Sequence, residues 1–150
     1  MKQIPKVFRF YTEGLCDMAD AFIFTVTVFN KYKNNANETL WKRTVLENCY
    51  FGAETAQKLN GNILSSENSF VCRILKNKAY TDKFKGENNK FTLAPGDVIV
   101  KGNVTDEIKD VSGRRITDLL QKYKGECFTV KSFSDNTLLR HKPHYRVRGE

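Results

Sequence analysis

The sequence predicts a mainly β protein, a small β-barrel or sandwich with one short α-helix and long loops. Several short stretches alternate apolar and polar residues with the period of two that a strand requires. Residues 116–123 place apolar side chains at the i, i+3, i+4 and i+7 spacing of an amphipathic helix, and this is the one convincing helix that we expect. Short strands joined by polar connections are typical of barrels and sandwiches, and we expect closure into a barrel.

Length and composition indicate one domain. The chain has 150 residues, of which 40% are hydrophobic and 28% charged, as in ordinary soluble domains. We assign residues 21–150 to a single barrel-like domain. Residues 1–20 are expected to be an N-terminal arm that docks on its own core or on a neighbouring subunit, with a loosely ordered terminus as the alternative. We recognise no secretory signal and no apolar run of transmembrane length, so the chain is expected to fold in a reducing cytosol.

The first half of the chain contains three expected strands. Residues 21–32 are the clearest, with apolar residues on an inner face and threonines on a solvent face. A polar turn at residues 33–38 leads to a second strand over residues 40–51, which suggests an antiparallel hairpin. Residues 69–75 alternate again and form the third strand.

Two segments between strands are expected to be irregular. Residues 53–59 suit a short helix that Gly61 ends, and residues 65–68 are expected to form a loop. Residues 76–90 are a long polar excursion, a length that is usually functional or mobile inside a compact domain. We predict that residues 1–20, 52–68 and 76–90 are disordered in the free chain and become ordered on assembly.

Residues 91–102 contain the most informative local pattern. Pro95 presets φ, Gly96 can take the positive φ of a tight turn, and Asp97 can bond back to the turn backbone. The β-branched residues 98–100 then leave as a strand, and an apolar run of this kind is typical of a strand buried on both faces or crossing a small barrel.

The last third of the chain supplies the helix and two further strands. Residues 103–108 either continue the sheet or lead out of it, and the helix is expected between Gly113 and Gly125. Residues 127–133 and 144–148 are expected strands, and residues 134–136 between them are an expected turn.

The strand and helix patterns define an expected core. Its members are Phe24, Val26, Trp41, Val45, Ile74, Val98, Val100, Leu119 and Val130. The four cysteines lie far apart without a C-x-x-C pair, so we expect reduced thiols, with Cys72 and Cys127 filling the core.

No recognisable catalytic motif is present, and the chain is expected not to be an enzyme and to need no cofactor. His141 and His144 are the only histidines, and the neighbouring Arg140 and Lys142 disfavour a cation between them. A Cys–His nucleophilic pair remains open spatially but has no supporting motif. Four carboxylates that stand in pairs are more simply solvated than catalytic: Asp17, Asp20, Asp106 and Glu107.

Positive charge is concentrated in the second half of the chain. The formal net charge is +8, and residues 76–150 hold sixteen Lys/Arg against ten Asp/Glu. Within the loop at residues 76–90, five lysines face only Asp82 and Glu87. These candidate contacts to DNA or a partner are Lys76, Lys78, Lys83, Lys85 and Lys90. A sequence-independent polyanion is one interpretation, and a solvated loop that serves solubility is the other.

A second hypothesis is an OB-like module that stacks single-stranded nucleic acid on exposed aromatic rings. The aromatic residues concerned are Tyr123, Phe128, Phe133 and Tyr145, and the neighbouring basic residues are Lys124, Lys131, Arg146 and Arg148. Aromatic residues that alternate in strands are more commonly core residues, with their basic neighbours facing solvent.

Three blocks of sequence, residues 26–45, 91–102 and 128–149, carry a family resemblance. The first block contains a strand, a turn and a strand with a tryptophan. The second contains the Pro-Gly-Asp turn and its strand, and the third ends in the strand His-Tyr-Arg-Val-Arg-Gly. With these features the chain resembles small structural proteins of tailed phages and prophages, in particular the head-completion or stopper proteins of the head–tail connector.

This resemblance implies a structural role in the virion without enzymatic activity. The implied assembly is a homo-oligomeric ring in the neck, made in the host bacterial cytoplasm, that joins the DNA-filled head to the tail. Its implied partners are other copies of itself, the adaptor or portal-side and tail-side virion proteins, and genomic double-stranded DNA in the lumen, bound without sequence specificity; no membrane is involved. A tail terminator or minor capsid protein is the nearest alternative within the virion.

Overall fold

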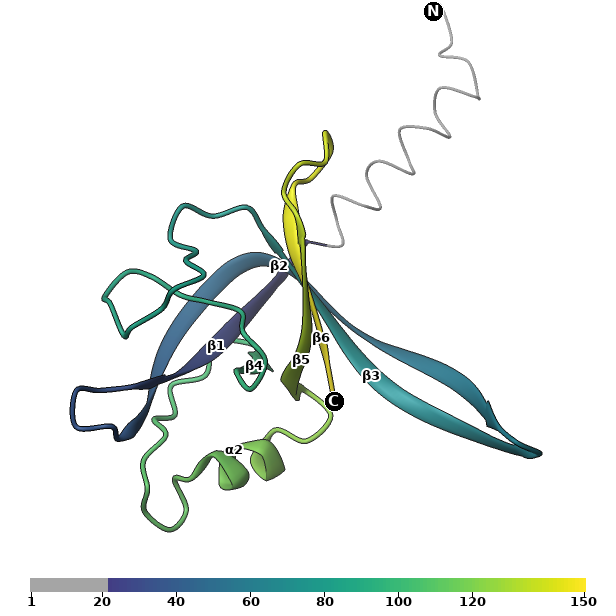
Figure 1. The fold of residues 1–150 in the computed structure, drawn as a ribbon, viewed down its shortest axis with the longest axis horizontal. Helices are drawn as coiled ribbons and strands as arrows, with labels where there is room; N and C mark the ends of the chain where they lie inside the picture. Colours follow the sequence, from purple (N-terminus) through teal and green to yellow (C-terminus); the bar gives the residue numbers. More distant parts are fainter. Residues whose placement is uncertain (1–21) are drawn as a thin grey trace, which may run out of the picture.

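The computed structural model describes residues 22–150, which form a closed antiparallel barrel of six strands in the order β1-β2-β3-β6-β5-β4 (Figure 1). The predicted fold class is therefore confirmed, as a barrel. The N-terminal arm expected at residues 1–20 lies outside the described residues. In chain order the elements are β1 (Phe24–Lys33), β2 (Thr39–Asn60), β3 (Ile63–Leu75), β4 (Val98–Lys101), α2 (Ile116–Lys122), β5 (Cys127–Asn136) and β6 (His144–Gly149).

The apolar side chains divide into an inner and an outer cluster. The inner cluster fills the barrel and includes Val26, Val28, Ile99 and Phe128. The outer cluster lies between the barrel wall and α2, and its buried members are Phe29, Val98, Val100, Val104, Leu119 and Cys127. Strand β4 is buried on both faces, as its β-branched run predicts, because Ile99 points into the barrel while its neighbours belong to the outer cluster.

The threonine-bearing face of β1 was expected to face solvent, and this expectation is wrong for the middle of the strand. Thr27 is buried, and its hydroxyl donates to the carbonyl oxygen of Gly102 (2.7 Å) and accepts from the backbone N–H of Val104 (2.9 Å). These bonds hold the segment that leaves β4 against the outside of β1. Residues 103–108 therefore lead out of the sheet, and they help to cover the face that strand alternation alone assigns to solvent.

Strand β2 changes the face that it buries at a bulge. Cys49 pairs with Phe24, whereas Leu46 pairs with Val26, and the intervening Asn48 takes a φ of 56°. Leu46 and Cys49 consequently both point into the barrel. Trp41 and Val45, expected in the core, are only half-buried, as is Phe24; the other six expected core residues are buried.

Residues 52–68 are neither a helix nor a loop, which corrects the expectation for this segment. Strands β2 and β3 pair without interruption from Cys49–Ile74 to Asn60–Ile63, and Gly61 takes a φ of 63° in the connecting turn. Among the described residues, residues 54–69 pair only with each other, and they project from the barrel as a two-stranded ribbon (Figure 1). We call residues 54–69 the hairpin arm.

The turn before β4 is fastened to β1 by a buried polar network. Gly96 has the expected positive φ of 98°. The Asp97 carboxylate accepts hydrogen bonds from the backbone N–H groups of Ala94 (2.9 Å) and Lys31 (3.0 Å) and from the Asn30 side-chain amide (3.0 Å). Burial raises the pKa of Asp97 although these hydrogen bonds and the Lys31 charge act in the opposite direction. The expected bond from Asp97 to its own turn is confirmed.

The remaining elements match their predicted positions with one correction. Helix α2 begins at Ile116, where Asp118 accepts a hydrogen bond from the backbone N–H of Arg115 (3.0 Å). Residues 134–136 are not a turn but the end of β5, paired with the start of β6. Three cysteines, Cys49, Cys72 and Cys127, are buried free thiols, and Cys16 lies outside the described residues. Burial raises the pKa of Cys49 to about 12, so this thiol is a poor nucleophile at neutral pH.

Candidate functional site

In the part of the chain that the structure describes, potential metal ligands do not cluster. Within residues 22–150, no three His, Cys, Asp or Glu side chains lie close enough to hold a metal ion. Over the same residues, no helix has the length and apolar character needed to cross a membrane. His144 has a structural environment, since its Nδ1 lies 2.7 Å from the carbonyl oxygen of Lys142 and its ring packs edge-on against Phe22.

The lysine-rich loop at residues 76–90 is a loop, as expected, and aromatic contacts fasten it to the barrel. Tyr80 stacks on Tyr145, with ring centroids 4.3 Å apart, and Phe84 packs edge-on against Tyr32 at 5.7 Å. Gly86 lies so close under the Tyr32 ring that a Cβ there would collide with it. The loop is thus anchored at two points while its charged residues face solvent.

All five candidate lysines of this loop are exposed, and none forms an ion pair with another described residue. The Glu87 carboxylate accepts a hydrogen bond from the backbone N–H of Lys85 (2.9 Å). Hydrogen bonds from the backbone are the main reason that the pKa of Glu87 is lowered. The loop therefore presents five cations whose positive charge is available to an external anion.

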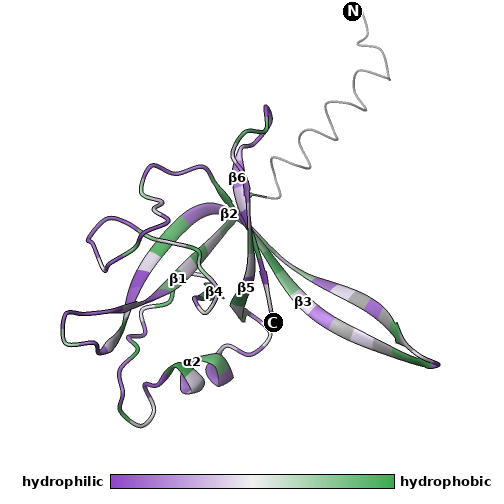
Figure 2. Cartoon of the chain, in the orientation of Figure 1, coloured by the Kyte–Doolittle hydropathy of each residue, from purple (hydrophilic) through white to green (hydrophobic). Residues whose placement is uncertain are grey.

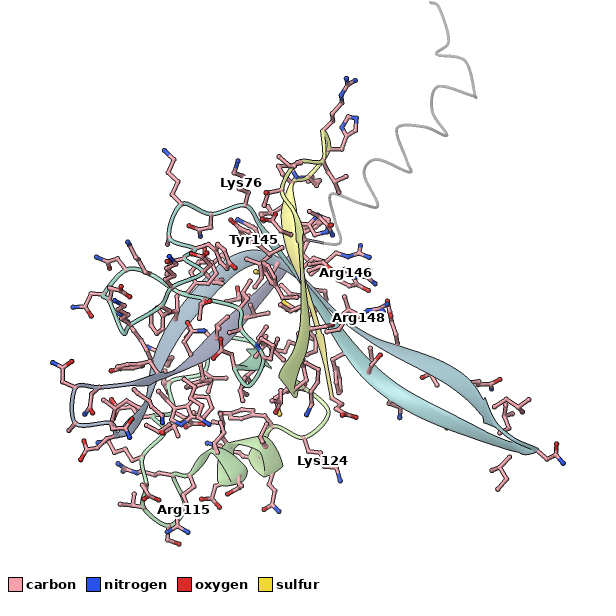
Figure 3. The ribbon with its side chains drawn as sticks, viewed as in Figure 1. Lys76, Arg115, Lys124, Tyr145, Arg146 and Arg148 are labelled. Carbon is pink, nitrogen blue, oxygen red and sulfur yellow. The ribbon has the colours of Figure 1, made fainter. Side chains whose placement is uncertain are left out.

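A second basic surface lies on the outside of β3 and β6; the sequence singles out Arg146 and Arg148 but does not show that Arg73 lies beside them. Arg73 and Arg146 are register partners across these strands, so two like charges stand directly opposite each other. Arg148 follows on β6, and its guanidinium group donates to Glu54 (2.7 Å) at the base of the hairpin arm (Figure 3). We call Arg73, Arg146 and Arg148 the arginine face.

The arginine face is packed and retains excess positive charge. The Arg73 guanidinium lies 5.2 Å from the centre of the Tyr50 ring, and Glu54 is the only acid paired with Arg146 and Arg148 among the described residues. The Nε atoms of Arg73 and Arg146 are buried and have no hydrogen-bond partner in residues 22–150. Guanidinium forks of this kind suit phosphate or carboxylate groups.

The aromatic residues considered for a stacking platform are engaged in packing. Phe128 lies inside the barrel, stacked on Phe70 at 5.9 Å, and Tyr145 is buried beneath Tyr80. The Tyr123 hydroxyl donates to Asp106 (2.7 Å), a carboxylate that also pairs with Lys122 (3.1 Å). Phe128 and Tyr145 are therefore core residues, whereas Tyr123 and Phe133 are half-buried.

The hairpin arm ends in three exposed apolar side chains, Leu59, Ile63 and Leu64, with exposed fractions of 70%, 71% and 62%. Figure 2 shows hydrophobic residues near the end of an otherwise mainly polar ribbon. Leu59 and Leu64 are register partners and therefore share one face. We call these three residues the arm tip.

An open groove of about 700 Å³ lies at the other end of β2. Most of the exposed area of its lining is apolar, with Leu40, Trp41, Ile108 and Ile116 among the lining residues, and four charged residues line it as well. Leu40 is exposed, and the other three are half-buried. We call this feature the apolar groove; nothing in the sequence pattern indicates it, because it is assembled from β2, the segment before α2 and α2 itself.

Comparison with known proteins places the chain in a family. Residues 23–150 match a family of unknown function, DUF6751, and the chain therefore belongs to it. No curated protein and no solved structure matches the chain.

Proposed function

We propose that this chain is a structural subunit of a tailed-phage virion, which assembles into a ring in the head–tail connector and contacts the DNA that passes through it. The observation that carries the proposal is the hairpin arm. A two-stranded ribbon that leaves its barrel exposes backbone edges and an apolar tip, and such features are normally covered by another chain.

Charge supports the DNA contact in this proposal. The exposed lysines of residues 76–90 and the arginine face supply cations on two surfaces of the protein. Lysine and arginine side chains that face a phosphate backbone bind it without reading base sequence. A tail terminator or minor capsid protein would use the same surfaces in another ring of the virion.

Particle association tests the proposal directly. Tailed particles purified from the host should contain the chain in a fixed, multiple copy number per particle, measured by quantitative mass spectrometry. Deleting the gene should leave filled heads and free tails that do not join, as seen by electron microscopy. Normal yields of joined, infectious particles without the chain would contradict the proposal.

The lysine loop gives a second prediction. Changing Lys78, Lys83 and Lys85 together to Gln should leave the free energy of unfolding within about 0.5 kcal/mol of the wild type, because these side chains are exposed. Filled heads should nevertheless release DNA, more severely at high salt, since the remaining phosphate contacts are screened.

The matched control removes the same charge elsewhere, at the exposed Lys33, Lys124 and Lys131. DNA retention by the control should exceed that of the loop variant. Equal retention by wild type, loop variant and control at low and high salt would assign the loop charges to solubility alone.

A further inference from the structure

We infer that the arm tip of one copy inserts into the apolar groove of the next copy, so that the subunits assemble head to tail. The inference rests on the proposed homo-oligomer and names the contact that would build it. It follows from three observations: an exposed apolar tip, a groove with an apolar lining, and the position of the two features at opposite ends of β2.

The arm tip exposes three neighbouring aliphatic side chains to solvent. Its three branched aliphatic side chains are each more than 60% exposed, and they lie within six residues of sequence around Gly61. Burying each of them in a partner would contribute roughly 1.5–3 kcal/mol. Three side chains of this size are enclosed more fully by a groove of about 700 Å³ than by a flat surface.

The groove supplies apolar surface of the same kind. Trp41 and Ile116 lie half-buried at the edge of the outer cluster, so their remaining surface faces the groove and is open to a partner. Leu40 adds an exposed aliphatic side chain. The groove is therefore an extension of the outer cluster that the chain's own residues 22–150 leave uncovered.

The two features lie at opposite ends of β2. Thr39, Leu40 and Trp41 begin the strand at the groove, and Leu59 stands next to its last residue. Figure 1 shows the turn before β2 and the end of the hairpin arm at opposite ends of the long axis of the molecule. A tip therefore cannot reach the groove of its own chain, and a contact between different surfaces of identical subunits closes into a ring or continues as a filament.

The absence of net charge on both the tip and the groove favours contact between these two surfaces over contact between other surfaces of two copies. The groove edge holds Glu38 and Asp110 against Lys109 and Arg115, so it is balanced. Residues 55–68 contain one lysine and one glutamate and are also balanced. On a chain with a net charge of +8, a neutral tip and a neutral groove meet without the repulsion that most other pairings of two copies would experience.

Cysteine cross-linking of the full chain tests the contact. In a Cys16→Ser background, the double variant Ile63→Cys/Leu40→Cys should form a ladder of covalent multimers when treated with a short bis-maleimide, because each copy carries both halves of the contact. Each single variant alone should give no ladder. The matched control, Ile63→Cys/Leu138→Cys, uses a leucine that is 97% exposed elsewhere and should also give none.

A polar tip provides the second measurement. Leu59→Ser/Leu64→Ser should raise the concentration at which half of the chain is assembled on the order of tenfold or more, whereas Leu138→Ser/Leu139→Ser should not change it. Both pairs are exposed, so circular dichroism and thermal unfolding should match the wild type at concentrations where neither protein is assembled. Absence of the ladder in the double-cysteine variant, or unchanged assembly of the polar-tip variant, overturns the inference. If the chain is nevertheless present in multiple copies in tailed particles, the proposed function stands without it.

Discussion

Replacing Phe128 with alanine should lower the free energy of unfolding by about 3–5 kcal/mol, one of the largest losses available to a single substitution in this chain. Phe128 is 1% exposed and belongs to the inner cluster, with the Phe70 and Phe51 rings 5.9 Å and 5.8 Å away. Truncation removes the free energy gained by burying the Phe128 ring. It also leaves a cavity that the closed wall of six strands cannot collapse to fill.

Urea unfolding at a fixed protein concentration measures this loss, since assembly would otherwise add concentration-dependent stability. Leu138→Ala serves as the control, because Leu138 is nearly fully exposed and its truncation should change the free energy by less than about 0.5 kcal/mol. A loss below about 1 kcal/mol for Phe128→Ala would mean that the barrel interior is loosely packed and would argue against closure.

The parts of the fold that the sequence predicts are those in which one local pattern decides the structure. Strand β4 follows from the turn residues Pro95 and Gly96 and from three successive β-branched residues. Helix α2 follows from its 3.6-residue periodicity. In both cases the burial pattern needs no information about distant segments.

The errors arise where distant segments change the environment of a strand. The hairpin arm lacks in its sequence the regular apolar–polar alternation by which a strand is recognised, so its residues favour a short helix followed by a loop. The bulge near Asn48 reverses the parity of β2, which moves Trp41 and Val45 out of the barrel. Bulges leave no reliable mark in a single sequence.

The candidate surfaces likewise divide into one that is contiguous in the sequence and two that the fold assembles. The lysine loop is contiguous in the chain, so its charge is visible in the sequence. The arginine face requires the pairing of β3 with β6, which brings together residues 73 positions apart, Arg73 and Arg146. The apolar groove likewise joins three separate segments. Local charge is thus predictable from sequence, whereas surfaces that are assembled by strand pairing require the fold.

Asp97→Ala should be the most damaging substitution of a polar residue, with a loss of roughly 3–5 kcal/mol in the free energy of unfolding. Asp97 is 2% exposed, and its removal leaves three donors without their acceptor: the N–H groups of Lys31 and Ala94 and the amide of Asn30. Each buried donor without a partner costs about 1–3 kcal/mol. The desolvation that raises the pKa of Asp97 offsets part of this sum, because the variant no longer buries a charge.

A double-mutant cycle separates the network from simple loss of packing. Asn30 donates to both Asp97 and the carbonyl oxygen of Thr92 (2.6 Å), so Asn30→Ala and Asp97→Ala disturb the same set of bonds. Their combined loss should be smaller than the sum of the single losses by about 1 kcal/mol or more, because the second substitution removes a group that the first has already left unpaired. The exposed Asp82→Ala is the control and should change stability by less than about 0.5 kcal/mol. Strict additivity, or a loss of less than 1 kcal/mol for Asp97→Ala, would show that the turn before β4 is held by its apolar neighbours and not by this carboxylate.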